Sequence, residues 1–132
     1  MSLGYYRDVE LSFEESEARI RSSLADQGFG VLTEIDVSAT LKEKLDANMA
    51  PYKILGACHP PTAYQALTAN PEIGLLLPCN VTLALNDDGT VRVSAIRATT
   101  MMKLVDNKDV EALAAEIDTK LQAAVDGLAG RE

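Results

Sequence analysis

The alternation of apolar and polar residues along the chain predicts five β-strands. It is clearest between Phe29 and Val37, where every second position is apolar or threonine, as expected for a half-buried strand. Similar runs predict four further strands, at residues 3–9, 52–58, within 75–85, and 91–96. Asp87-Asp88-Gly89 separates the last two runs and is a turn signal, so these two strands are expected to form a hairpin.

Helical periodicity marks other segments. Apolar residues recur every three or four positions from Asn107 to Leu128, which predicts a long amphipathic helix. Ser12 followed by Glu15 is a capping-box pattern, so a second helix is expected to begin there and to end at Gly28. Two shorter helices are expected at residues 39–47, with Ser38 as cap, and 62–69. The order of elements predicts an α+β fold, in which a mostly antiparallel sheet of about five strands carries helices packed on one face.

Length and charge narrow the class of protein. The 132 residues fit a single domain over residues 1–132, and 47% are hydrophobic, which is enough for a buried core. Twelve basic against twenty acidic residues give a net charge of −8, which argues against nucleic-acid binding and against docking on anionic lipid. No secretory leader is expected, because residues 1–6 lack a basic segment and a long apolar run, and no apolar run of the sequence is long enough to span a bilayer. With only two cysteines, a cytoplasmic location with reduced thiols is expected.

The charge is unevenly distributed along the chain. Residues 47–86 carry only two formal charges, Lys53 and Glu72, whereas both flanks are densely charged. Such a stretch belongs either to the core or to a surface that a partner covers. Its proline-rich loops are expected at the surface, where uncharged loops are typical of a subunit interface or the mouth of a ligand site.

The same stretch holds the candidates for chemistry, Cys58, His59 and Cys79. Two thiolates and an imidazole suit zinc or Cu(I), but the spacing is wrong and a fourth ligand is missing, so no metal or other cofactor is expected. A thiol beside an imidazole can be activated, yet neighbours on a strand point to opposite faces. A third alternative makes both cysteines small core residues and His59 a loop residue. If the third and fourth strands are neighbours, the two thiols lie at one end of the sheet.

Glu72 and Lys53 are further candidates as the charged residues of this stretch. Glu72 is expected either to hydrogen-bond loop amides or to pair with Lys53, because an isolated buried carboxylate is unfavourable. No glycine-rich phosphate loop and no hydrolase nucleophile motif occurs, and no catalytic residue is assigned. The sequence leaves open whether the protein is an enzyme.

Three ordered blocks of sequence carry a family resemblance. They are residues 28–37, residues 52–58 followed by Pro60, and residues 71–81. Together they resemble the family of the domain of unknown function 302. The resemblance implies an α+β domain of TBP-like arrangement, with a long last helix, that forms a homodimer, and it implies no reaction. The family motif falls on Cys58, Pro60, Glu72, Pro78 and Cys79.

The resemblance weakens one candidate, because related sequences often have asparagine in place of His59. The leading hypothesis is a homodimeric protein that binds a small molecule or serves as an accessory protein, with no established reaction. The alternative is a cysteine-dependent redox or sulfur-handling protein that uses Cys58 and Cys79.

Overall fold

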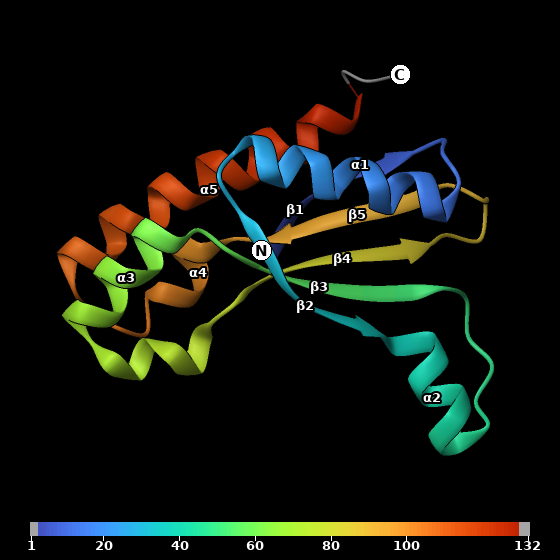
Figure 1. Ribbon diagram of the computed structural model, residues 1–132, viewed down its shortest axis with the longest axis horizontal. Coiled ribbons are helices and arrows are strands. Elements are labelled where there is room, and N and C mark those ends of the chain that lie inside the picture. The colour runs from blue at the N-terminus through green and yellow to red at the C-terminus, as the bar shows by residue number, and fades with distance from the viewer. Residues whose placement is uncertain (1–2, 130–132) are drawn as a thin grey trace.

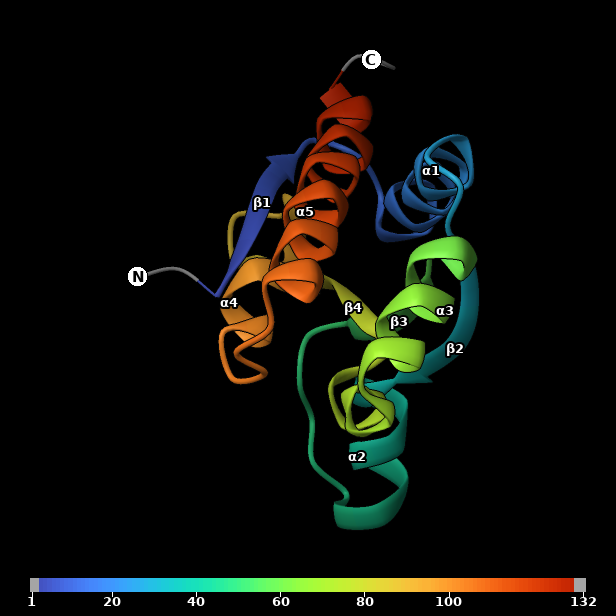
Figure 2. The ribbon, with the colours of Figure 1, turned by 90° about the vertical axis from the view of Figure 1, so that its left-hand side faces the viewer.

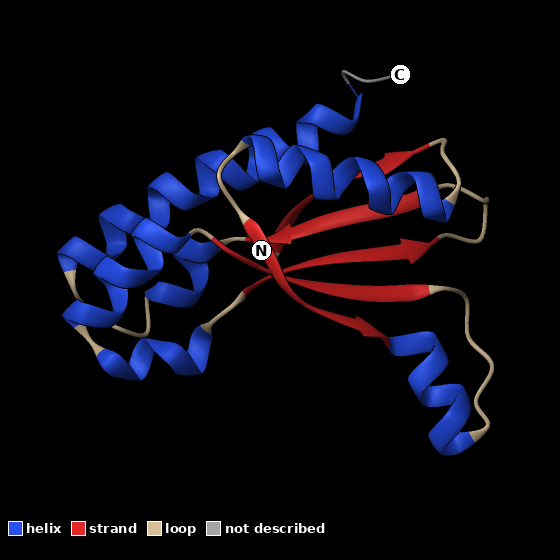
Figure 3. Cartoon of the chain, in the orientation of Figure 1, coloured by secondary structure: helices blue, strands red, loops and turns tan. Residues whose placement is uncertain are grey.

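A computed structural model describes residues 3–129 of the chain, and its centre is an open, five-stranded antiparallel sheet (Figures 1 and 3). The strands lie in the order β1-β5-β4-β3-β2. Their bounds are β1 Gly4–Val9, β2 Gly30–Asp36, β3 Tyr52–Cys58, β4 Cys79–Leu85 and β5 Val91–Ile96. The predicted five-stranded antiparallel sheet is therefore confirmed, including the hairpin between β4 and β5.

Two helices, α1 (Phe13–Asp26) and α5 (Lys108–Ala129), lie side by side over one face of the sheet (Figure 2). The core between them and the sheet includes Ile20, Leu24 and Leu121, which are fully or almost fully buried. Ser12 caps α1 by accepting a hydrogen bond from the Glu15 amide at 3.0 Å, as its position in the sequence predicts. The prediction of helices packed on one face is confirmed for these two elements.

Strand β2 differs from its prediction. It is an edge strand and most of its side chains are exposed, although its alternating pattern predicts a half-buried strand. The pairing of β2 with β3 shifts register between Val31 and Thr33, as at a β-bulge. A bulge interrupts the period of two, so alternation along the sequence no longer assigns residues to one face of the sheet.

Helix α2 (Val37–Leu45) begins earlier than predicted and has a different cap. The Asp36 carboxylate accepts a hydrogen bond from the Ala39 amide at 2.9 Å, whereas the predicted cap, Ser38, donates its hydroxyl to Asp36. None of the residues of α2 is buried, and the helix projects from the end of the sheet where β3 begins (Figure 1).

The remaining helices gather at the opposite end of the sheet, where β3 ends and β4 begins (Figure 1). They are α3 (Pro60–Ala69), the 3-10 helix η1 (Pro71–Leu76) and α4 (Ala98–Met102), of which only α3 is predicted from the sequence. Helix α4 is fixed to α5, because the carboxylate of Asp118 on α5 accepts hydrogen bonds from the Ala98 and Thr99 amides. The single-domain and TBP-like assignments stay predictions. Within residues 3–129, no helix combines the length and apolar character needed to cross a bilayer.

Candidate functional site

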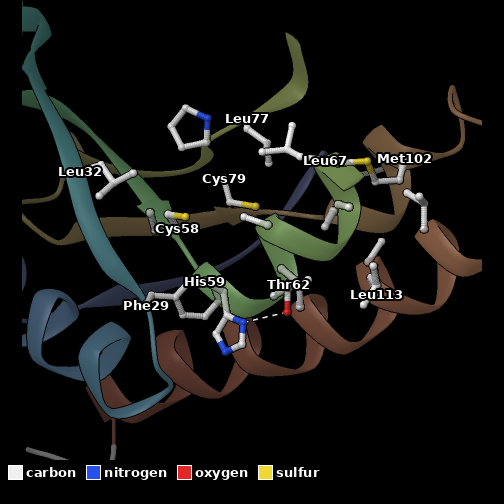
Figure 4. Close-up of a pocket in the computed structure, with 18 of the residues that line it drawn as sticks. Phe29, Leu32, Cys58, His59, Thr62, Leu67, Leu77, Cys79, Met102 and Leu113 are labelled. Atoms are coloured by element: carbon white, nitrogen blue, oxygen red, sulfur yellow. Dashed lines mark hydrogen bonds between the residues drawn. The ribbon is translucent and has the colours of Figure 1, made fainter. Parts of the chain in front are cut away.

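A cavity of about 330 Å³ lies at the end of the sheet, enclosed by α3, α4, α5 and the loop that leads into β4 (Figure 4). Its lining is almost entirely apolar and contains no Asp, Glu, Lys or Arg side chain. Leu32 on β2 and Leu67 on α3 line the cavity and are 68% and 37% exposed, so the cavity opens between these two elements.

Small side chains create this empty volume. Helices α3, α4 and α5 meet at the end of the sheet, and each turns alanines towards the cavity where a larger apolar residue would fill it. The five lining alanines are Ala57, Ala63, Ala66, Ala98 and Ala114. Interiors normally pack with few voids larger than a water molecule, so an apolar volume of this size is unusual for a packed core.

Cys58 and Cys79 both line the cavity, and Figure 4 shows both sulfur atoms turned into it. Cys58 is half-buried at the end of β3, Cys79 is buried at the start of β4, and neither is in a disulfide. The prediction that the two thiols lie at one end of the sheet is therefore confirmed. Burial, with smaller contributions from the charges of Asp118 and Cys58, raises the pKa of Cys79 to about 11. Cys79 therefore stays a neutral thiol at physiological pH and is a poor nucleophile.

His59 lies at the floor of the cavity, with its ring edge-to-face against Phe29 at a centroid distance of 5.4 Å. Its Nδ1 forms a 2.8 Å hydrogen bond with the Thr62 hydroxyl, and its Nε2 edge lies against Gly28. In Figure 4 this second nitrogen is on the side of the ring away from the two cysteines. His59 therefore joins the start of α3 to the end of α1 and does not face Cys58 as a base.

Lys53 and Glu72 do not line the cavity. The Lys53 ammonium contacts Glu17 at 2.8 Å and Glu34 at 3.5 Å, and Arg21 binds the same two carboxylates, so the expected pairing of Lys53 with Glu72 is not formed. Glu72 is exposed on η1, where its amide donates to the Asn70 side chain.

The electrostatics of the Lys53 cluster are those of satisfied ion pairs. Partial burial alone would raise the pKa of Glu17, but hydrogen bonds from Lys53 and Arg21 outweigh it and the pKa is lowered. The hydrogen bond to Glu17 raises the pKa of Lys53. Both groups are therefore held in their charged forms.

The described part of the chain contains no set of side chains that would bind a metal ion. Among residues 3–129, no group of three or more His, Cys, Asp or Glu side chains is placed to hold an ion. The candidate site is thus an uncharged cavity with two thiols. Sequence reasoning found Cys58, Cys79 and His59 but missed Thr62 and the alanines. The only signal in the sequence for the alanines is the spacing of Ala63 and Ala66, which places these two residues on one face of a helix.

Comparison with known proteins assigns the family. A family model described as domain of unknown function DUF302 matches residues 5–128. The chain belongs to the DUF302 family. The match includes every residue that lines the cavity, so the site lies wholly within the DUF302 domain.

A solved DUF302 structure has the same fold. The crystal structure of an uncharacterized conserved DUF302 protein from Bacillus stearothermophilus is 29% identical to this chain, with a TM-score of 0.90. The alignment covers 96% of this chain and 98% of that one. No curated protein shows significant similarity to the chain. Neither the family description nor that of the crystal structure names a reaction, so this DUF302 protein has no established reaction.

Proposed function

We propose that this DUF302 protein is a single-domain, homodimeric binding protein that takes a small apolar molecule into the cavity at the end of its sheet. The observation that carries the proposal is the preformed apolar cavity of about 330 Å³. Ligand pockets occupy about 300–1,000 Å³ and are mostly apolar. The absence of a catalytic set around the cavity favours binding over catalysis.

The volume limits the size of the ligand. An apolar cavity of about 150 Å³ takes up benzene. The cavity here is about twice as large, which corresponds to a ligand of about a dozen non-hydrogen atoms. Burial of each methylene group contributes about 0.8 kcal/mol, from which the loss of translational and rotational freedom is subtracted. We therefore expect dissociation constants from the millimolar to the micromolar range.

Titration with methyl nonyl ketone tests the binding function, because this ketone has about a dozen non-hydrogen atoms. Isotope-labelled protein should show saturable shifts of the methyl resonances of Leu67, Met102 and Leu113, which line the cavity. The methyls of Leu45 and Met49, on and after α2, lie at the other end of the sheet from the cavity (Figure 1). They serve as the internal control, and their resonances should not shift. Absence of saturable shifts would refute the proposal.

The uncovered face of the sheet supports the homodimer. A row of uncharged residues crosses all five strands in register on this face. The row consists of Tyr6, Ser94, Thr82, Ile54 and Ile35. The neighbouring Asp8 and Arg92 neutralise each other through two hydrogen bonds, at 2.9 and 3.0 Å. A chain with a net charge of −8 can therefore bring this face against its copy without strong repulsion.

The face of the sheet is too small by itself for a stable dimer, and α2 offers further surface. Five strands about 4.8 Å apart and about 20 Å long cover roughly 480 Å². A stable interface buries about 800 Å² per partner, so the sheet alone is too small. Leu45 and Met49, on and after α2, are 72% and 41% exposed and lie beyond the sheet, where they can extend the interface over a second copy.

Light scattering during gel filtration tests this part of the proposal. A dimer has twice the 14.2 kDa chain mass, or about 28 kDa. Ile54→Glu places a charge within the row and should yield monomer, whereas Thr119→Glu, on an exposed position of α5, should remain dimeric. A wild-type protein that elutes as monomer at high concentration would contradict the homodimer but not ligand binding.

A second candidate function rests on the two thiols in one cavity. In a cysteine-dependent redox or sulfur-handling protein, the half-buried Cys58 is the thiol that reagents reach first, and Cys79 is its buried partner. Diamide should then take two electrons and two protons from the pair and become the hydrazine, leaving a Cys58–Cys79 disulfide that mass spectrometry detects. Cys79→Ser is the control and forms no intramolecular disulfide. If wild-type protein keeps both thiols under these conditions, this candidate is removed.

The proposal includes the setting of the protein. The excess of acidic over basic residues supports a protein without a nucleic-acid or membrane partner, and a content of only two cysteines, too few for a disulfide framework, supports a cytoplasmic location. Its partners are then a second copy of the chain and the small molecule in the cavity.

A further inference from the structure

Most polar groups of the cavity are already used or are weak, and the remaining one, the Thr33 hydroxyl, belongs to an exposed residue of β2. His59 uses Nδ1 in its hydrogen bond with Thr62, and its Nε2 edge lies against Gly28, on the side of the ring away from the two cysteines (Figure 4). The Thr62 hydroxyl is the partner in the same bond. The two thiols are poor hydrogen-bonding groups. A ligand in this cavity therefore finds little compensation for any strong hydrogen bonds that it gives up to water.

The electrostatic surroundings of the cavity disfavour anions. No lysine or arginine lines the cavity. The Asp118 carboxylate accepts a hydrogen bond from the amide of Ala98, a lining residue, and its charge adds to the effect of burial in raising the pKa of Cys79. Asp118 is fixed there by hydrogen bonds from the Ala98 and Thr99 amides and from the Thr99 hydroxyl. The net charge of −8 adds to the same effect over a longer range.

From this arrangement we infer that the cavity selects uncharged ligands, such as hydrocarbons, ketones and esters, and excludes carboxylates of the same shape, including fatty-acid anions. The inference rests on the proposed binding function of the cavity and names its ligand class. Selection arises because a carboxylate must either enter without a counter-ion or first take up a proton. An uncharged ligand of equal shape meets neither penalty.

Methyl nonyl ketone and decanoate are a matched pair for the test, since they differ only by a methyl group in place of a carboxylate oxygen. At about pH 7.5 the ketone should bind about a hundredfold more tightly, because protonation of a carboxylate becomes tenfold less favourable with each pH unit above its pKa. Decanoate affinity should rise about tenfold when the pH is lowered by one unit, and ketone affinity should stay constant. Calorimetry or displacement of a neutral fluorophore measures both.

A charge placed at the mouth should reverse the selection. Leu32 lines the cavity and is 68% exposed, so Leu32→Lys brings an ammonium to the opening without burying it. We expect Leu32→Lys to bind decanoate at least about tenfold more tightly than wild type does, whereas ketone affinity should change to the same extent in Leu32→Lys and Leu32→Gln. Leu32→Gln is the matched uncharged control and should not gain decanoate affinity.

The outcomes separate this inference from the function on which it rests. Preference for the ketone together with gain of decanoate binding in Leu32→Lys supports charge selection. Equal binding of ketone and decanoate by wild type, or a preference for decanoate, overturns the inference while the binding function stands. If neither molecule binds wild type or Leu32→Gln, the binding function itself is overturned.

Discussion

The two ends of strand β3 show how the same uncharged stretch of sequence can serve different purposes. Near its beginning, Lys53 contacts Glu17 and Glu34, and each charge has its partner. At its end, Cys58 faces an apolar cavity that is not filled by side chains. Paired charges stabilise the contacts between elements, whereas the walls of an unfilled apolar cavity lack the packing contacts that would stabilise the fold. The cavity end is therefore the better candidate for function, and the charged end for stability.

The largest expected effect comes from filling the cavity. Ala114 is 4% exposed and lines it from α5, so Ala114→Phe should occupy the ligand volume and reduce ketone affinity by about a hundredfold or more. Ala115→Phe, at the neighbouring exposed position of the same helix, is the control and should bind normally. Thermal unfolding of both variants reports whether the fold is retained. Full ketone affinity in a folded Ala114→Phe protein would place the ligand elsewhere.

The second effect concerns the charged end. Lys53→Met leaves Glu17 and Glu34 with only Arg21 as counter-charge and should lower the free energy of unfolding by about 2 kcal/mol, between the values for exposed and buried pairs. The control is Lys42→Met, which removes the exposed Lys42–Asp46 pair and should change stability by less than about 0.5 kcal/mol. Urea unfolding measures both. A loss of ketone binding in Lys53→Met would contradict the assignment of stability to the charged end of β3 and of binding to the cavity end.

A smaller effect is expected at Gly28, beneath the floor of the cavity. Gly28 has a φ of +87°, and a Cβ there would lie 3.2 Å from His59 Nε2. Gly28→Ala should therefore lower the free energy of unfolding by about 1–2 kcal/mol, the usual penalty for a left-handed residue other than glycine. Because His59 must shift, ketone affinity should also fall a few-fold. Gly30→Ala is the control, since a Cβ at Gly30 meets nothing within 4 Å. Equal stability of the two variants would show that the Gly28 contact is unimportant.

The smallest effect is a pH dependence. The pKa of Glu17 is lowered in the folded protein, so its contribution to stability is present above its usual value of 4.5 and is lost as the pH falls through the folded pKa. The pKa of Lys53 is raised, so its contribution is complete below its usual value of 10.5. The stability difference between wild type and Lys53→Met should therefore shrink between about pH 5 and pH 3. Urea unfolding at several pH values tests this, and a constant difference would contradict it.

Local sequence patterns predicted much of the fold because their causes are local. The Ser12 cap, the periodicity of α5 and the turn at residues 87–89 each depend on neighbours within a few positions. Strand β2 shows the limit, because the shift of pairing after Val31 depends on the partner strand β3. Helix α4 was not predicted for the same reason, because the Asp118 carboxylate that accepts a hydrogen bond from its first amide comes from α5.

By itself, the sequence determined the antiparallel sheet and the covering helices, because alternation, helical periodicity and turn signals are local. The nearness of Cys58 to Cys79 depended on the pairing of β3 with β4, which the sequence left open. Only the tertiary structure decided what surrounds the thiols. Empty volume belongs to no single residue, since it arises where Ala63, Ala66 and Ala114 from different helices face one another. The partner of Lys53 was decided in the same way, because its carboxylates come from α1 and β2, which are distant in sequence and meet only in the fold.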